Sequence, residues 1–282
     1  MGNPAMKDKQ LEYLKDDQRI MARLAEEANE ALSVHPTDWF VICGQGSINY
    51  PGLSDEESDV DSKMLTIPSF RDIVQNKPPL NSVHEMIDNK EHVDLKDVRE
   101  YMRIARKQNI NFVEVFFTNY WIANQPYKDI WLEMMRHAEE FIRMNPYRTL
   151  KCCKGMCYEK QHALEHRYPS RAYYIDTFGY DGKQLQHAIR IYEFAQKYTK
   201  HYPFRECLTV DDPEWLLAVK RHKANVRLED ARAMMEDTVT KMDKLEAEFN
   251  KYHKDEEYQP TRELYDELLY ELIKRAVKQE IV

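Results

Sequence analysis

The first thirty residues carry the apolar spacing of an amphipathic helix. An apolar side chain recurs every four positions, at Ile20, Leu24, Ala28 and Leu32. This period places all four side chains on one helical face. Pro36 and Asp38 then end the pattern, since proline cannot continue a helix. We therefore expect one long helix in this part of the chain.

Shorter apolar runs after this helix predict the strands of one small sheet. Residues 39–43, Trp-Phe-Val-Ile-Cys, are typical of a buried strand. Residues 59–67 predict a second strand, which Pro68 closes. Residues 82–87 and 91–95 predict two further strands, with Asp88 and Asn89 at the turn between them.

From residue 97 onward the pattern has helical periodicity. Residues 97–108 form an amphipathic helix by this pattern. Prolines lie near the boundaries of the further helices that we expect, at 127–143, 147–167, 181–200, 212–253 and 260–280. The sequence thus predicts an α+β fold, with a small mixed-sheet core and its N-terminal helix at residues 1–125 and a mostly helical domain at residues 126–282.

Charge and composition narrow the classes of function. The net charge is −8, from 41 Lys and Arg against 49 Asp and Glu. This balance argues against a nonspecific DNA coat, because phosphate binding needs concentrated positive charge. Residues 145–175 nevertheless carry an excess of Lys and Arg, which can meet a phosphate-bearing ligand locally. We find no apolar run of membrane-spanning length and no signal segment, so we expect a cytoplasmic protein with no membrane partner and with five reduced cysteines.

Two aspartates in the second predicted strand are candidate metal ligands. Asp59 and Asp61 are two residues apart, so their side chains share one face of the strand, while Val60 points toward the core. Hard carboxylate oxygens select Mg²⁺ or Mn²⁺ over zinc. A pair of such cations can bind the attacking and leaving oxygens of a phosphoryl transfer.

A glycine-serine turn precedes these aspartates in a chain that has only seven glycines. Gly46 permits close approach of the backbone to a ligand, and the Ser47 amide and hydroxyl can bind the outer phosphates of a nucleotide. The sequence lacks the Gly-Lys-Ser/Thr of a Walker motif, and Asn49 replaces the third glycine of GxGxxG. Gly44 is a turn residue in this interpretation.

The combination of Gly46-Ser47 with Asp59-Val60-Asp61 resembles the signature of the DNA polymerase β-like nucleotidyltransferase superfamily. Gln45 departs from it, standing where a hydrophobic residue usually precedes Gly-Ser. Further segments are similar to one branch, the predicted nucleotidyltransferases that phages often carry and that occur near RNA-repair genes. These segments are Tyr50, Ser58-Asp59, Asp94-Leu-Lys-Asp97-Val-Arg, Asn109-Ile-Asn111-Phe-Val-Glu114 and Lys183-x-x-x-His187-x-x-Arg190, within residues 39–195.

The resemblance implies transfer of a nucleoside monophosphate from an NTP to an acceptor hydroxyl, with two-metal catalysis by Mg²⁺ or Mn²⁺ and release of pyrophosphate. Asp59 and Asp61 would bind the metals, and Gly46 and Ser47 would bind the β- and γ-phosphates. The acceptor could be RNA, a protein or a small molecule. The basic segment favours RNA or another phosphorylated acceptor.

The same signature includes a third acid that lies between two hydrophobic residues, and two positions in this sequence match that pattern. They are Val93-Asp94-Leu95 and Val113-Glu114-Val115. We choose Asp94 as third metal ligand and catalytic acid, with Glu114 and Asp97 as alternatives. A carboxylate there could also accept the proton of the acceptor hydroxyl. The structural alternative is that Asp94 only caps the helix that follows it.

Four basic residues are candidate nucleotide ligands. Lys183, His187 and Arg190 lie at i, i+4 and i+7 and so share one helical face. Lys63 shares a strand face with Asp59 and Asp61 and could pair with them or with phosphate. The set of Lys183, His187 and Arg190 could instead be a solvated stripe, which is the commoner case for a lone set of this kind.

Two other functions remain open at this point. A binding-only homologue would retain the fold and bind nucleotide without turnover, and loss of the role of Asp94 would favour it. His162, Glu165 and His166 match the His-x-x-Glu-His pattern of a zinc peptidase, although no third ligand is evident. Cys152, Cys153 and Cys157 lack the spacing of a zinc knuckle and fit half-buried helix positions better.

Overall fold

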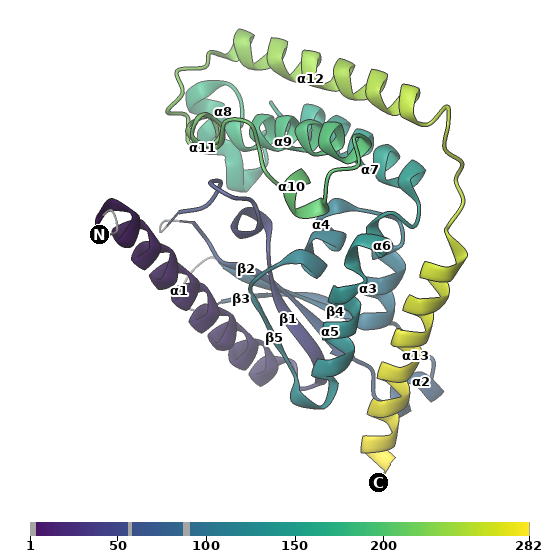
Figure 1. Ribbon diagram of the computed structural model, residues 1–282. Helices are drawn as coiled ribbons and strands as arrows, with labels where there is room; N and C mark the ends of the chain where they lie inside the picture. The colour runs from purple at the N-terminus through teal and green to yellow at the C-terminus, as the bar shows by residue number, and fades with distance from the viewer. Residues whose placement is uncertain (1–3, 56–57, 87–90, 282) are drawn as a thin grey trace.

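The computed structural model describes residues 4–55, 58–86 and 91–281, and these form an α+β fold (Figure 1). One mixed sheet has the strand order β3-β4-β2-β1-β5. β2 and β4 are parallel, and the other neighbouring pairs are antiparallel. The predicted fold class is therefore confirmed. The strands are β1 (Asp38–Gln45), β2 (Asp61–Ile67), β3 (Asn81–Glu85), β4 (His92–Asp97) and β5 (Trp121–Ala123).

A long N-terminal helix, α1 (Pro4–Val34), covers one face of the sheet (Figure 1). Leu24 and Ala31 are fully buried against Ile42 of β1 and Met64 of β2. The spacing of four residues thus marks the face that packs on the strands. This helix was predicted from its apolar period, and the prediction is confirmed.

Glu27 lies inside this apolar interface. Its side chain is fully buried, and among the described residues neither of its carboxyl oxygens has a hydrogen-bond partner. Burial raises the pKa of Glu27 to about 8; the nearby Ser62 hydroxyl opposes this shift, and the Glu91 carboxylate adds to it. The group is therefore largely protonated at neutral pH.

The opposite face of the sheet is covered by helices from distant parts of the sequence, and Phe116 lies at their centre. Its ring contacts Trp131, Phe141 and Tyr265, with ring centroids 5.8, 5.3 and 5.9 Å away. These residues come from three separate helices, which the Phe116 cluster joins to the sheet. The helices on this side are α3 (Val98–Ala105), α4 (Ile110–Val113), α5 (Lys128–Arg136), α6 (Ala138–Ile142) and α13 (Gln259–Ile281), with η2 (Glu114–Phe117) between α4 and β5.

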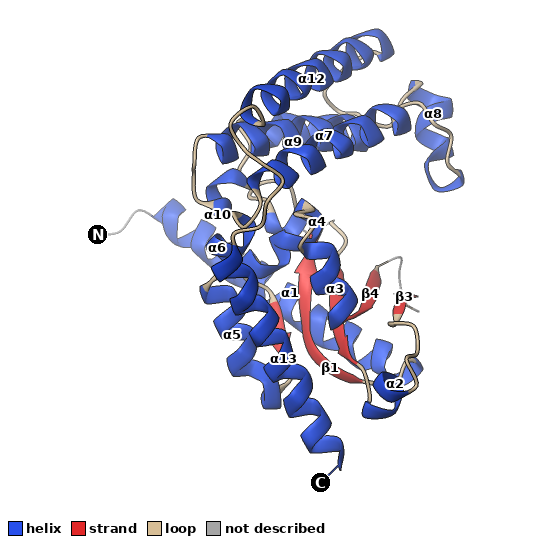
Figure 2. Cartoon of the chain, turned by 90° about the vertical axis from the view of Figure 1, so that its right-hand side faces the viewer, coloured by secondary structure: helices blue, strands red, loops and turns tan. Residues whose placement is uncertain are grey.

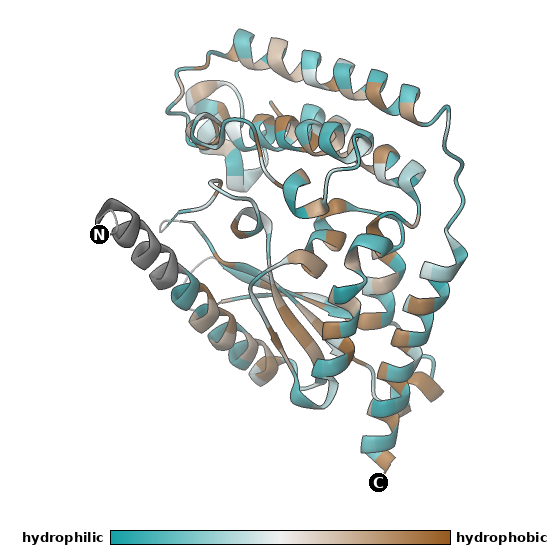
Figure 3. Cartoon of the chain, in the orientation of Figure 1, coloured by the Kyte–Doolittle hydropathy of each residue, from teal (hydrophilic) through white to brown (hydrophobic). Residues whose placement is uncertain are grey.

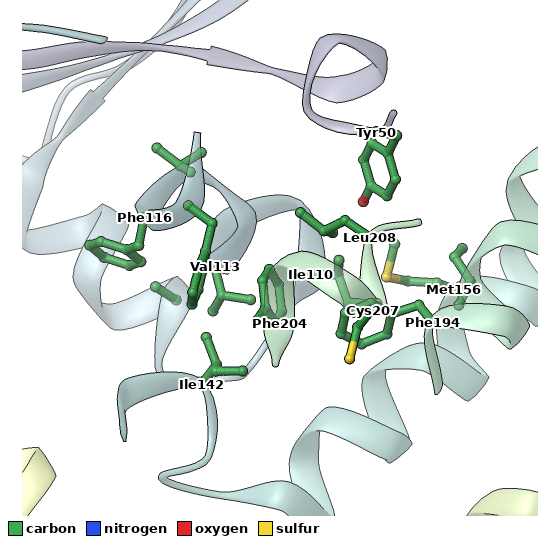
Figure 4. Packing of buried hydrophobic residues seen from close by; sticks show 14 of the residues in the cluster. Tyr50, Ile110, Val113, Phe116, Ile142, Met156, Phe194, Phe204, Cys207 and Leu208 are labelled. Atoms are coloured by element: carbon green, nitrogen blue, oxygen red, sulfur yellow. The ribbon is translucent and has the colours of Figure 1, made fainter. Parts of the chain in front are cut away.

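A second group of helices lies beyond one end of the strands (Figure 2). It contains α7 (Pro146–Ala163), α8 (Ala172–Phe178), α9 (Gly182–Thr199), α10 (Phe204–Cys207), α11 (Pro213–Lys220) and α12 (Leu228–Phe249). Apolar positions recur along α12 between hydrophilic ones, so that one side packs on α7 and α9 (Figure 3). Residues of this group share a core with the sheet unit (Figure 4). The domain boundary at residue 125 stays a prediction.

The predicted helix at 212–253 is wrong, because it is two helices. α11 ends at Lys220, and His222 and Asn225 have positive φ angles of 56° and 49° before α12 begins. The His222 ring accepts a hydrogen bond from the Gly182 amide (3.1 Å) and stacks on Phe178 (4.0 Å between centroids). These tertiary contacts outweigh the helical period of the segment.

Smaller differences concern element ends and short elements. The segment 127–143 divides into α5 and α6 at His137, and β2 begins two residues after Asp59. The short helix α2 (Phe70–Val74) and strand β5 were not predicted. The predicted turn at Asp88 and Asn89 lies outside the described residues. None of the helices described here is long and apolar enough to cross a bilayer.

Replacement of the central aromatic tests this packing. Phe116→Ala should lower the free energy of unfolding by about 3–5 kcal/mol, because it removes a large buried ring and leaves a cavity among three helices. Val74→Ala, at a side chain that is 67% exposed, should change it by less than about 0.5 kcal/mol. Urea denaturation followed by circular dichroism measures both values; equal effects would contradict the assigned core.

Glu27 should make stability depend on pH. Its folded pKa lies above the unfolded value, so its contribution is complete below about pH 4.5 and is lost as the pH rises to about 8. The difference in unfolding free energy between wild type and Glu27→Gln should therefore fall by roughly 2–4 kcal/mol from pH 5.5 to 8.5. Urea denaturation across this range measures the difference, and a constant difference would refute a buried, protonated Glu27.

Candidate active site

The glycine-serine turn follows directly from β1 and is held by a buried glutamate. Gly46 has φ = +74°, which favours glycine, and begins the short helix η1 (Gly46–Asn49). The Gly46 amide donates to Oε1 of Glu114 (2.9 Å), and the Tyr50 hydroxyl donates to Oε2 (2.6 Å). Glu114 is 2% exposed. It therefore fixes the turn that carries the Ser47 amide and hydroxyl.

The two aspartates lie at the start of β2. Asp59 is exposed and Asp61 is half-buried, while Val60 between them is fully buried under α1. Nδ1 of His92 on β4 lies 3.1 Å from Oδ1 of Asp61. Burial raises the pKa of Asp61, and Asp59 adds to this effect, while His92 and Lys183 oppose it.

Asp94 is on the neighbouring strand, directly opposite Lys63 in the parallel pairing of β2 and β4. Lys63 Nζ lies 2.8 Å from Oδ2 of Asp94, and Lys96 Nζ lies 3.5 Å from Oδ1. Lys63 also donates to Oε1 of Gln45 (2.7 Å). Asp94 thus lies on the same sheet face as Asp61, but its carboxylate is paired with two lysines.

The other two candidates for the third acid have structural contacts of their own. Glu114 accepts the hydrogen bonds of the turn, as described above. Asp97 caps α3 by accepting from the Arg99 amide (2.8 Å), and it also pairs with the Arg99 guanidinium (2.7 Å). Asp97 lies at the far end of β4, opposite Thr66. The helix cap that the sequence allowed for Asp94 is therefore made by Asp97.

The predicted basic stripe lies on α9 and faces the sheet across the site. The Arg190 guanidinium lies 3.7 Å from the centroid of the Tyr50 ring, so the stripe contacts the segment that follows the turn. Burial lowers the pKa of His187 well below its usual value, and Arg190 and Lys183 lower it further. His187 is therefore a neutral imidazole at pH 7.

One pocket of about 360 Å³ is lined by the glycine-serine turn, the two aspartates, the Lys63–Asp94 pair and the basic stripe of α9. Each of the nine residues predicted from the sequence lines it, although they come from four separated segments. The nine are Gly46, Ser47, Asp59, Asp61, Lys63, Asp94, Lys183, His187 and Arg190, and the pocket wall also includes Gln45, Asn111, Phe112, Glu114, Met156, Lys160, Ile191 and Lys220.

Two pocket lysines were missed in the sequence. Lys160 comes from the last turns of α7, within the basic segment 145–175 that signalled a phosphate-bearing ligand. Lys220 ends α11, and burial together with Lys183 lowers its pKa. No sequence signal marked Lys220, since the helix was expected to continue through it. Both lysines add positive charge opposite the aspartates.

The acids present fit a divalent cation that arrives with phosphate oxygens. Among residues 4–55, 58–86 and 91–281, no three His, Cys, Asp or Glu side chains are grouped closely enough to hold a metal ion. Mg²⁺ in nucleotide sites is usually held by only one or two carboxylates together with substrate phosphates. Asp59 and Asp61 supply such a pair, and a cation beside them would relieve the unfavourable charge of Asp61.

The zinc-peptidase pattern is not assembled as a site in the part of the chain that the structure describes. Arg232 holds both carboxylate oxygens of Glu165, at 2.8 and 2.6 Å. The His162 and His166 rings are 6.0 Å apart between centroids, and His166 also packs on Tyr168. All five cysteines are free thiols, four of them buried.

Comparison with known proteins gives a distant likeness. The crystal structure of a nucleotidyltransferase-like protein from Exiguobacterium sibiricum 255-15, at 1.90 Å resolution, resembles this chain with a TM-score of 0.30 and 13% identity, over 80% of this chain and 77% of the other. No protein-family model and no curated protein matches the chain. A likeness of this size decides neither family nor activity.

A double-mutant cycle tests the anchoring of the turn. Glu114→Ala and Tyr50→Phe should each lower the unfolding free energy by about 1–3 kcal/mol, because each leaves a buried polar group without its partner. The double variant should lose less than the sum, by more than about 0.5 kcal/mol, since both changes break the same hydrogen bond. Urea denaturation gives the three values, and strict additivity would contradict the shared contact.

Proposed function

We propose that this protein is a nucleotidyltransferase that moves a nucleoside monophosphate from an NTP to an acceptor hydroxyl and releases pyrophosphate. One observation carries the proposal. A single pocket joins aspartates on the sheet to four cationic side chains on three helices, and a metal-bound triphosphate needs this pairing of charges. The four are Lys160, Lys183, Arg190 and Lys220.

In this proposal the two walls of the pocket have different roles. Asp59 and Asp61 hold the divalent cation, and the Ser47 amide and hydroxyl bind an outer phosphate. Lys183 and Lys220 neutralise the charge on the triphosphate and on the leaving pyrophosphate. His187, as a neutral imidazole, can donate or accept one hydrogen bond at the phosphates.

The cation, Mg²⁺ or Mn²⁺, would polarise the phosphate oxygens and lower the charge that develops during transfer. The resemblance implies two such cations, with Asp94 as the third acid. In this arrangement the acceptor hydroxyl attacks the α-phosphorus: its oxygen forms the new P–O bond, its proton passes to the third-acid carboxylate, and the bond to pyrophosphate breaks. RNA, a protein or a small molecule can supply this hydroxyl.

A binding-only homologue is the second candidate, and one observation favours it. The Asp94 carboxylate is held by Lys63 and Lys96, so its availability as a third metal ligand or proton acceptor depends on breaking these ion pairs. This form of the protein would bind a metal-nucleotide complex in the same pocket without turnover.

Incubation with each α-³²P-labelled NTP, Mg²⁺ and total RNA or cell lysate tests the proposal. Label should transfer to an acceptor with wild type, and transfer should fall by at least ~100-fold in Asp59→Ala and in Asp61→Ala, because each loses a carboxylate that holds the cation. Asp237→Ala, on an exposed part of α12, is the matched control and should retain activity.

Two outcomes separate the candidates. Nucleotide binding without transfer to any acceptor would support the binding-only homologue. Transfer that persists in the Asp59→Ala/Asp61→Ala double variant would contradict the assigned site.

A further inference from the structure

Lys63 is held in the catalytic pocket by contacts on three sides. Its side chain is 6% exposed, and its ammonium contacts Oδ2 of Asp94 (2.8 Å) and Oε1 of Gln45 (2.7 Å). The ring of Phe112 lies on a further side, with its centroid 4.6 Å from Nζ. A buried ammonium with two oxygen partners and an aromatic face is fully compensated where it stands.

The partners of Lys63 are themselves fixed. Gln45 donates its amide NH₂ to the Ser62 carbonyl (3.2 Å), so its own carbonyl oxygen must face Lys63. Lys96 donates to Oδ1 of Asn81 (2.5 Å), which keeps it beside the second oxygen of Asp94. Withdrawal of Lys63 would therefore leave Oε1 of Gln45 and Oδ2 of Asp94 without their buried partner.

The charges along this face of the sheet divide into two parts. Asp59 and Asp61 together carry two negative charges and can attract one divalent cation. The neighbouring group of Lys63, Asp94 and Lys96 places two ammonium groups around one carboxylate, a formal net charge of +1. A second divalent cation placed in this group would meet repulsion from two buried ammonium groups.

We propose that this active site binds one divalent cation per nucleotide and that the Lys63 ammonium takes the place of a second one. Asp94 is then the partner that positions Lys63 and is not a metal ligand. The charge of Lys63 is fixed in the pocket before nucleotide binds, beside Asp61 on the same strand face. Gln45 completes the ammonium site.

This inference rests on the proposed function, since it concerns the metal-nucleotide complex of the same pocket. It differs from the two-cation arrangement that the resemblance implies. The two arrangements give different metal counts, and the count is measurable without catalytic turnover.

Equilibrium dialysis with Mn²⁺ tests the inference. The nucleotide probe is an equal mixture of the four α,β-methylene NTP analogues, which cannot release pyrophosphate; protein-bound metal and nucleotide are counted separately. Wild type should bind one Mn²⁺ per bound nucleotide. Asp94→Asn should also bind one, with an Mn²⁺ affinity within about threefold of wild type, whereas Asp61→Asn should lose the bound Mn²⁺.

Whereas Asp94→Asn removes the carboxylate partner, Lys63→Met removes the lysine of the same ion pair. It removes the ammonium and frees Oδ2 of Asp94, so the count should rise toward two Mn²⁺ per nucleotide. Lys251→Met, at an exposed lysine outside the pocket, is the matched control and should bind one. Circular dichroism checks that each variant is folded, and Asp94→Asn keeps the test decisive if Lys63→Met does not fold.

The results separate this inference from the proposed function. Two Mn²⁺ per nucleotide in wild type, falling to one in Asp94→Asn, would overturn the inference and leave the nucleotidyltransferase site intact. Nucleotide and Mn²⁺ both failing to bind to wild type would overturn the proposed function, and the inference with it.

Discussion

The parallel pairing of β2 with β4 is the constraint on which the rest of the site depends. It places Lys63 opposite Asp94 and brings Asp61 beside His92. Because alternate residues of a strand share a face, one register sets the positions of all of these groups at once. A shift of one residue would turn Asp61 and Lys63 toward α1 and place Val60 and Ser62 in the pocket.

Contacts through Tyr50 connect the sheet to the helices on the other side of the pocket. The Tyr50 hydroxyl is bound by Glu114, which also holds the Gly46 amide, and the Tyr50 ring supports the Arg190 guanidinium. The Gly46-Ser47 turn and the α9 cations are therefore fixed relative to one another through one buried aromatic residue. This arrangement holds the pocket in a defined shape before a ligand enters.

Much of the site could be predicted from the sequence because its signals are local. The Asp59-Val60-Asp61 alternation marks a strand face, and the four-residue and three-residue spacing of Lys183, His187 and Arg190 marks a helix face. These two patterns follow from backbone geometry alone. The pattern of apolar and polar positions along the chain also predicted the fold class and the long N-terminal helix.

The remaining features depend on contacts between distant segments. The helix breaks after Lys220 because His222 stacks on Phe178 and accepts a hydrogen bond from the Gly182 amide. The spacing of apolar residues along the segment gives no sign of these contacts. The role of Glu114 follows from its contact with Gly46, 68 residues away along the chain. The pairing of Asp94 with Lys63 depends on the register between β2 and β4. These strands are neighbours in the sheet, although β3 lies between them in the sequence. Local patterns therefore identified the groups, and tertiary packing decided what each one contacts.

The central claim is that Asp59 and Asp61 and the α9 cations bind opposite ends of one metal-nucleotide complex. A crystal structure with Mn²⁺ and an α,β-methylene NTP, with the metal located by anomalous scattering, tests it most directly. The account predicts Mn²⁺ between the Asp59 and Asp61 carboxylates and the triphosphate, with the outer phosphates near Ser47 and Lys183. Mn²⁺ or triphosphate bound away from these aspartates would contradict it.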